Sequence, residues 1–112
     1  MRSKYRAVPT TVHGIRFASK AEAKRYGELL YLGYAGEVRN LELQPRFDLR
    51  VDGKSVGTYV ADFRYEARPS PYNVMWRDVV EDVKGVRTPV YKLKKKLVEA
   101  QYGLTIQEVR MR

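Results

Sequence analysis

The sequence lacks cysteine, has one histidine and contains no long apolar run. The absence of cysteine excludes a disulfide scaffold and any cysteine-based zinc site, and it is typical of an intracellular protein. The lone histidine, His13, cannot form a histidine-rich metal site. Any bound metal must therefore be held by oxygen ligands, which favours Mg²⁺ or Mn²⁺.

The sequence also indicates where the protein is located and how many domains it has. No segment has the length and apolar character of a membrane span, and the basic start, MRSKYRAVPT, is not followed by the apolar core of a signal peptide. We therefore expect a cytoplasmic protein with no membrane partner. With 112 residues, 44% hydrophobic and 31% charged, the chain is predicted to form one domain over residues 1–112, in which residues 1–9 are a basic N-terminal arm.

The net charge of +9 is concentrated at the two ends of the chain. Residues 1–20 contain five basic residues and no acidic one, whereas residues 85–112 contain seven basic and two acidic residues. The stretch between them has ten basic and eleven acidic residues. Basic ends around an acidic centre suit a protein that grips a polyanion by its phosphates while metal-binding acids approach one of them. The alternative is that the basic charge only aids solubility.

The first part of the chain predicts a β-hairpin followed by a helix. His13-Gly14 separates two short strand-like segments and is typical of a tight turn. Ser19 and Glu22 have the spacing of a capping box, which predicts a helix that ends near Gly33. Glu22 shares one helical face with three apolar residues, Tyr26, Leu29 and Leu30.

The rest of the chain predicts three strands, a second helix and a last strand at 104–109. The strand-like runs are 38–51, interrupted by Pro45, then 54–65 and 74–84. Thr88-Pro89 starts a helix that ends at Gly103, with an expected inward-facing apolar stripe of Val90, Leu93 and Leu97. Omitting the hairpin, the order αβββαβ predicts an α/β fold in which helices flank a mixed four-stranded sheet.

The strongest chemical signal is Asp82-Val83-Lys84, preceded by Asp62 in the neighbouring predicted strand. Because side chains alternate along a strand, Asp82 and Lys84 share one face, while Glu81 points to the other. Two carboxylates from adjacent strands repel each other unless a cation lies between them, which predicts a site for a hard metal ion. A lysine on the same face can stabilise the transition state of phosphodiester hydrolysis. The alternative is a solvated face at the edge of a sheet.

Glu22 has two compatible interpretations. Its capping-box position is a complete structural explanation. Its place on the apolar face of the helix also turns a carboxylate toward the body of the protein, where a charge is costly unless it is paired or bound to metal. We therefore expect a role at the metal site, either direct or through water.

The sequence resembles the PD-(D/E)XK nuclease superfamily in its helical glutamate, Asp62 and Asp82-Val83-Lys84 in the order αβββαβ. More closely, it resembles a family of small phage-encoded proteins of unknown function related to phage Holliday-junction resolvases of the endonuclease I type. This second resemblance covers about residues 4–109 and rests on the segments FASKAEAKRY, LELQPRF, TYVADFRYEA, VVEDVKG and YKLKKKL. Ala61 replaces the proline that gives the superfamily motif its name.

The resemblance implies a restriction-endonuclease-like core, a Mg²⁺ cofactor for which Mn²⁺ can substitute, and a homodimer acting on branched DNA. If the protein is phage-encoded, it would act in the host cytoplasm. Asp62 and Asp82 would be metal ligands, Glu22 the helix carboxylate and Lys84 the catalytic lysine. The Val83 carbonyl would be a further ligand.

The basic residues expected to contact DNA are Lys4, Arg6, Lys20, Lys92, Lys95 and Lys96, and Lys94 belongs to the same cluster. A solvated helix face is the alternative for the lysine cluster, and an ordinary strand position is the alternative for Gln44, which could reach the site. We therefore expect a metal-dependent endodeoxyribonuclease selective for branched or Holliday-junction DNA. The alternatives are a nicking or recombination-associated nuclease, a non-catalytic DNA-binding protein, and a phage structural protein.

Overall fold

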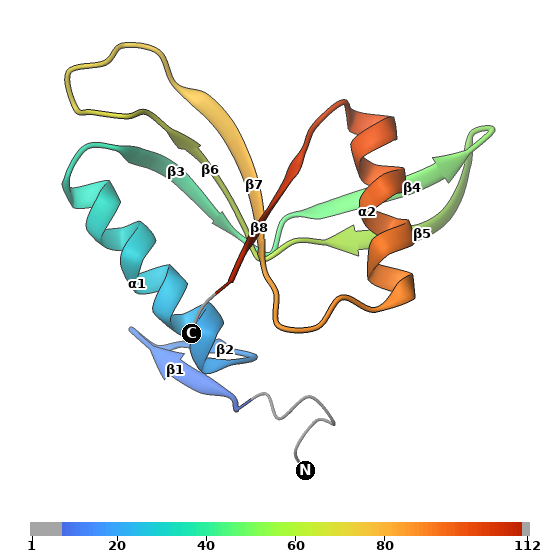
Figure 1. The fold of residues 1–112 in the computed structure, drawn as a ribbon, viewed down its shortest axis with the longest axis horizontal. Coiled ribbons are helices and arrows are strands. Elements are labelled where there is room, and N and C mark those ends of the chain that lie inside the picture. Colours follow the sequence, from blue (N-terminus) through green and yellow to red (C-terminus); the bar gives the residue numbers. More distant parts are fainter. Residues whose placement is uncertain (1–7, 111–112) are drawn as a thin grey trace.

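The structure is a computed structural model that describes residues 8–110 (Figure 1). Within these residues, two helices and eight strands follow one another. They are β1 (Thr10–Val12), β2 (Ile15–Phe17), α1 (Lys20–Tyr34), β3 (Val38–Leu43), β4 (Arg46–Val51), β5 (Lys54–Val60), β6 (Phe63–Ala67), β7 (Arg77–Val83), α2 (Pro89–Tyr102) and β8 (Ile106–Val109).

A mixed four-stranded sheet with the order β3-β6-β7-β8 forms the centre of the protein. Its strands pair antiparallel except for β7 and β8, which are parallel. Two antiparallel pairs, β1–β2 and β4–β5, stand outside this sheet. The expected α/β fold with a mixed four-stranded sheet, two helices and an N-terminal hairpin is therefore confirmed.

The two faces of the central sheet are covered differently (Figure 1). Helix α1 packs on one face, where the buried residues are Phe17, Ala23, Tyr26, Leu29, Val38, Phe63, Tyr65 and Val79. Helix α2 and the β4–β5 pair cover the other, where the buried residues are Phe47, Leu49, Tyr59, Ala61, Val80, Tyr91, Val98 and Ile106. Consecutive residues of β7, such as Val79 and Val80, contribute to opposite cores because side chains alternate along a strand.

The predictions that rest on local signals are confirmed. His13 and Gly14 both have positive φ, as the turn between β1 and β2 requires. The Ser19 hydroxyl caps α1 by accepting a hydrogen bond from the backbone N–H of Glu22 at 3.1 Å. Thr88 caps α2 in the same way, and Gly103 ends that helix with a φ of 66°.

The prediction of three strands between the helices is wrong, because the region forms five. The first run breaks at Gln44-Pro45 and the second at Ala61-Asp62, and at each break the chain passes between the central sheet and the β4–β5 pair. The breaks face each other: the Gln44 N–H donates to the Asp62 carbonyl at 2.9 Å, and the Ala61 N–H to the Pro45 carbonyl at 3.1 Å. Alternating hydrophobicity persists through such a corner and does not mark it.

Two further boundaries and one helix face differ from expectation. Strand β7 begins at Arg77, because Val74 and Met75 lie exposed in the preceding loop, and β8 begins only at Ile106. In α2, Val90 and Leu93 are 63% and 59% exposed, and Leu97 is partly buried. The buried positions are Tyr91 and Val98, because the face that contains them docks on β4 and β5.

Among residues 8–110, neither helix has the length and apolar character needed to cross a membrane.

Candidate functional site

Asp62 and Asp82 lie next to each other at the C-terminal end of β7. Asp82 is the second-last residue of β7, and Asp62 occupies the corner between β5 and β6. The register of β6 and β7, with Phe63 opposite Glu81, continues to place Asp62 opposite Asp82. Each aspartate accepts a backbone hydrogen bond from the other segment: the Asp62 N–H donates to Asp82 Oδ1 at 3.1 Å, and the Val83 N–H donates to Asp62 Oδ2 at 2.7 Å. The positions of the two carboxylates are therefore fixed by backbone hydrogen bonds between the two segments.

Glu22 approaches the same corner from the first turn of α1. Its side chain is only 6% exposed, and it lines a cavity of about 170 Å³ together with Asp62 and Gln44. The prediction that Glu22 faces the body of the protein is confirmed. The serine half of the predicted capping box forms, whereas the Glu22 carboxylate interacts with the backbone N–H of Ala18. We refer to Glu22, Asp62 and Asp82 as the carboxylate site.

The environment disfavours negative charge on all three residues of the carboxylate site. Burial and, to a smaller extent, the charges of Asp62 and Asp82 raise the pKa of Glu22 to about 7, against the lowering effects of Ala18 and Lys84. Burial raises the pKa of Asp82 to about 6, although Lys84 opposes this shift. The pKa of Asp62 is also raised by burial, against the hydrogen bond from Val83. A nearby cation would relieve this cost.

Lys84 and two tyrosines border the carboxylate site. The Tyr59 hydroxyl donates to Asp82 Oδ2. The ammonium group of Lys84 lies 4.1 Å from the centre of the Tyr91 ring, where the negative face of the aromatic system attracts it. Lys84 thus stands on the side of β7 that carries Asp82 and lowers the pKa of that carboxyl. The predicted shared face of Asp82 and Lys84 agrees with this arrangement.

Glu108 of β8 is a fourth carboxylate near Asp82, and its Oε2 atom has three partners within the protein. The parallel register places it beside Asp82. It accepts a hydrogen bond from the Tyr91 hydroxyl at 2.7 Å and forms ion pairs with Arg87 at 3.1 Å and Lys95 at 3.6 Å. The hydrogen bond from Tyr91 is the main reason why the pKa of Glu108 is lowered. This side chain is therefore a stable anion with partners of its own.

Glu81 points to the opposite face of β7, as strand alternation predicts. It is 1% exposed and is held by Arg25, whose Nε and Nη2 donate to its two carboxylate oxygens at 2.7 and 3.1 Å, and by the Tyr65 hydroxyl at 2.6 Å. The sequence did not reveal this network, because Arg25 and Glu81 are distant in the chain. A substitution of Glu81 is therefore not neutral, contrary to what its outward direction from Asp82 alone suggests.

The donor set of the carboxylate site suits a hard divalent cation. Within residues 8–110, no three carboxylate or histidine side chains converge closely enough to enclose a metal ion. Mg²⁺ does not need such a cage, since it is usually held by one or two carboxylates and keeps several waters. Asp62 and Asp82 can supply these ligands, because each carboxylate retains lone pairs beyond the hydrogen bonds described above.

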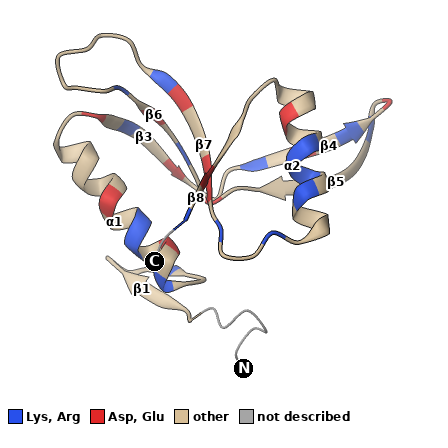
Figure 2. Ribbon diagram, in the orientation of Figure 1, with Lys and Arg blue, Asp and Glu red and all other residues tan. Residues whose placement is uncertain are grey.

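The basic residues expected to contact DNA occupy different surroundings. Lys20, Lys92 and Lys96 are exposed, and the ribbon of α2 is coloured blue for basic residues along its middle (Figure 2). Lys95 is paired with Glu108, and Lys94 donates to the Thr58 carbonyl at 3.0 Å. Lys4 and Arg6 lie outside the described residues. The exposed lysines of α2 are thus available to a phosphate backbone, whereas Lys95 is paired with Glu108 and lowers the pKa of the nearby Asp82.

Sequence reasoning missed Tyr59 and Glu108 and undervalued Gln44. Gln44 is not an ordinary strand residue: it has a φ of 51° at the corner after β3 and lines the cavity beside Glu22. The proline that follows it was the only signal of this corner in the sequence. Tyr59 and Glu108 carry no local signal, because their relevance comes from pairing between distant segments.

The fold and site together define a mixed α/β domain in which β7 ends beside two buried carboxylates, Glu22 and Asp82, and the partly buried Asp62. The chain belongs to the family DUF1064, described as a protein of unknown function, whose family model matches residues 2–111. No curated protein and no solved structure matches the chain.

Proposed function

We propose that this protein is a metal-dependent endodeoxyribonuclease whose catalytic residues are Glu22, Asp62, Asp82 and Lys84. The observation that carries the proposal is the pairing of Asp62 and Asp82 where the β5–β6 corner meets the end of β7, with Glu22 of α1 and Lys84 near enough for their charges to interact with this pair. Three carboxylates with raised pKa values beside a lysine are costly as a purely structural arrangement. They are useful if a cation and a phosphate group occupy the space between them.

The proposed cofactor is Mg²⁺, with Mn²⁺ able to replace it. Asp62 and Asp82 would hold the ion, with Glu22 bound directly or through water and the Val83 carbonyl as a further ligand. When bound, such an ion supplies polarisation of a phosphoryl oxygen and neutralisation of developing negative charge.

The protein's own residues have separate roles in this proposal. The Tyr59 hydroxyl and the Asp62 N–H fix the orientation of the Asp82 carboxylate. Lys84 is held near the Tyr91 ring, with its ammonium group available to a non-bridging phosphate oxygen. There it would orient the attacking water and stabilise the transition state. Glu108, Arg87 and Lys95 form a closed charge network at the border and keep Lys95 beside the site.

The proposed substrate is branched or Holliday-junction DNA in the cytoplasm, and the proposed working form is a homodimer. The net charge of +9 and the exposed lysines of α2 support a nucleic-acid substrate. The resemblance to phage junction resolvases supports the branched form. Two symmetric cuts require two active sites, and one chain supplies one carboxylate site, which supports the dimer. Sedimentation that shows a monomer both free and on junction DNA would favour the nicking alternative.

The experiment that tests the proposal compares cleavage of supercoiled, linear and four-way-junction DNA with Mg²⁺, Mn²⁺ or EDTA. We expect cleavage with either ion, no cleavage in EDTA, and preference for the junction. Asp52→Asn is the matched control, because it removes a carboxylate at the exposed β4–β5 turn and should retain activity. Undiminished cleavage in excess EDTA would refute the metal dependence, and binding without cleavage under every condition would favour a non-catalytic DNA-binding protein.

A further inference from the structure

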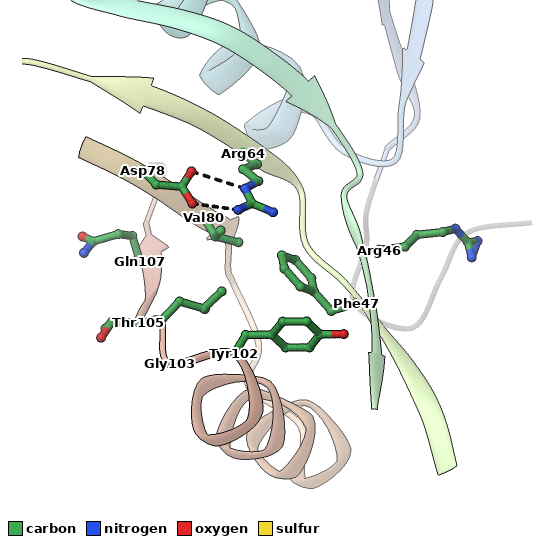
Figure 3. A pocket seen from close by; sticks show the side chains of 10 residues that line it. Arg46, Phe47, Arg64, Asp78, Val80, Tyr102, Gly103, Thr105 and Gln107 are labelled. Carbon is green, nitrogen blue, oxygen red and sulfur yellow. Dashed lines mark hydrogen bonds and ion pairs between the residues drawn. The ribbon is translucent and has the colours of Figure 1, made fainter. Parts of the chain in front are cut away.

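A second cavity, of about 510 Å³, lies between the start of β7 and the C-terminal end of α2 (Figure 3). It is on the face of the sheet that carries Asp82, but it contains none of the residues of the carboxylate site. Its walls combine an ion pair, two aromatic rings and two aliphatic side chains, which are Arg64, Asp78, Phe47, Tyr102, Val80 and Leu104. Neither the sequence pattern nor the proposed chemistry accounts for this cavity.

The aromatic wall of the cavity is fixed by its own contacts. Phe47 and Tyr102 pack edge to face, with ring centres 5.2 Å apart and an angle of 71° between the rings. The Tyr102 hydroxyl donates to the Asp48 carbonyl at 2.8 Å, which anchors the outer ring. Phe47 is 4% exposed, whereas Tyr102 is 44% exposed. The wall therefore offers one deep and one accessible aromatic surface whose positions are set before any ligand arrives.

The opposite wall is polar and consists of an exposed ion pair. Arg64 donates to the two Asp78 oxygens from Nε at 3.3 Å and from Nη2 at 2.8 Å. No hydrogen bond from Arg64 Nη1 is found to any residue within 8–110. The guanidinium carbon lies 5.7 Å from the centre of the Phe47 ring, and Figure 3 shows the Arg64–Asp78 pair and this ring bordering the same space. The rim thus presents a free donor and a carboxylate acceptor above an aromatic and aliphatic base.

We propose that this cavity binds one unpaired nucleobase of the DNA substrate. A nucleobase is flat and apolar on its faces and carries donors and acceptors at its edge, which matches the rings and aliphatic groups below and the Arg64–Asp78 pair at the rim. The volume lies within the range of small-ligand pockets. The net charge of +9 favours an occupant attached to a phosphate backbone.

The inference rests on the proposed function and specifies its substrate as DNA that contains an unpaired base. Asp78 and Asp82 lie on the same face of β7, four residues apart, which corresponds to about 13 Å along the strand. A base seated in the cavity would therefore belong to the stretch of DNA that spans the carboxylate site. Bases that are already unpaired at a branch or bulge enter such a cavity at the lowest cost, because no pairing is lost. The cavity thus gives a physical reason for a preference for branched DNA.

The test measures binding in EDTA, so that no cleavage is needed. The probes are a duplex with one unpaired 2-aminopurine and the same duplex fully paired. We expect the wild-type protein to bind the bulged duplex about tenfold more tightly and to change the 2-aminopurine fluorescence. Tyr102→Leu and Arg64→Gln should each remove most of this preference. The matched control is Tyr34→Leu, which removes a 91% exposed ring from α1 and should leave the preference intact.

The outcomes separate this inference from the proposed nuclease activity. Equal binding of both duplexes by the wild-type protein, or equal losses in Tyr102→Leu and Tyr34→Leu, would overturn the cavity assignment even if the protein cleaves DNA with Mg²⁺. A preference that depends on Tyr102 in a protein without nuclease activity would support the cavity and refute the proposed function. Deoxyadenosine monophosphate is the second probe: if it binds as tightly as the bulged duplex, the cavity takes free nucleotides and the DNA assignment is wrong.

Discussion

Glu81 and Asp82 are consecutive buried residues of β7 that have opposite electrostatic surroundings. Glu81 faces α1, where Arg25 and Tyr65 donate to both of its carboxylate oxygens. Asp82 faces the other side, where the Tyr59 hydroxyl and the Asp62 N–H donate to it and Lys84 is a nearby cation that forms no ion pair with it. Both side chains are 1% exposed, so burial does not distinguish them.

The comparison shows how a structural carboxylate differs from a candidate functional one. The charge of Glu81 is matched by a guanidinium within the protein, and this ion pair fastens α1 to the sheet. The charge of Asp82 is disfavoured, with its pKa raised to about 6. A carboxylate that is expensive to ionise and lies among other carboxylates is a candidate to act on something from outside the protein.

Removing charge from the carboxylate site should abolish turnover. Asp82→Asn and Asp62→Asn preserve shape but remove the charge that would hold the ion, so cleavage should fall by roughly 10³-fold or more while the fold and DNA affinity remain. Lys84→Ala should lose cleavage to a similar degree. Glu22→Gln keeps the helix cap at Ser19 and should yield a stable protein with little activity. Single-turnover cleavage and DNA binding measure these effects, and an active Asp82→Asn variant would contradict the site.

Removing charge from the Glu81 network should instead destabilise the protein. Glu81→Gln removes the buried charged partner of Arg25, whose side chain is 19% exposed and keeps only its ion pair with the more exposed Glu28. Breaking a buried ion pair on one side costs about 3–5 kcal/mol. Urea denaturation should show this loss, and the double variant Arg25→Met/Glu81→Gln should recover part of it because no unpaired charge remains. A loss below about 1 kcal/mol in Glu81→Gln would mean that the network carries little of the stability.

In EDTA, stability should fall as the pH rises through the pKa values of the carboxylate site. The pKa of Glu22 is raised from 4.5 to about 7 and that of Asp82 from 3.8 to about 6. A raised carboxyl pKa stabilises the folded state fully below the unfolded value, and this contribution is lost as the pH rises through the folded value. Unfolding free energies should thus decrease by up to about 3 kcal/mol between about pH 5 and pH 8.

Two comparisons check this pH dependence. Glu22→Gln should weaken the dependence of the unfolding free energy on pH, because a side chain that cannot ionise does not lose stability as the pH rises. Mg²⁺ should restore stability at the higher pH in the wild-type protein but not in Asp82→Asn. If the wild-type and Glu22→Gln curves run parallel, the burial of Glu22 is not the cause.

The lysines of α2 should affect DNA affinity uniformly, without changing cleavage of bound DNA. Replacing Lys92 and Lys96 with glutamine should reduce the slope of log K against log salt by about 0.9 for each DNA phosphate that a lysine no longer neutralises. Lys95→Gln should reduce it less, because Lys95 is already paired with Glu108. Lys54→Gln, at the exposed start of β5, serves as the control. An unchanged slope in the double variant would mean that other residues bind the phosphates.

The sequence predicted those parts of the structure that depend on neighbouring residues. Caps at Ser19 and Thr88 and the turn at His13-Gly14 are decided within a few residues, and all three are confirmed. The opposite directions of Glu81 and Asp82 also follow from strand alternation alone.

The parts that were missed depend on contacts between distant segments. The pairing of Arg25 with Glu81 and the corner at Asp62 are determined by which elements meet. The buried face of α2 was predicted wrongly for the same reason: two stripes with helical spacing exist, and docking on β4 and β5 selects the one with Tyr91 and Val98. The proximity of Asp62 and Asp82 was expected from the sequence, but the hydrogen bond from Tyr59 to Asp82 was not.

The corner at Asp62 also has a consequence for how the chain tolerates change in length. The β4–β5 pair leaves the central sheet at Gln44-Pro45 and returns at Ala61-Asp62, and its far end is the exposed turn at Asp52-Gly53. Residues added in equal number to β4 and β5 on either side of that turn lengthen the β4–β5 pair, while its strand pairing and the direction of each side chain are preserved. The hydrogen bonds across the two breaks would hold Asp62 in place. The length of the β4–β5 pair can thus evolve or be engineered independently of the carboxylate site at its base.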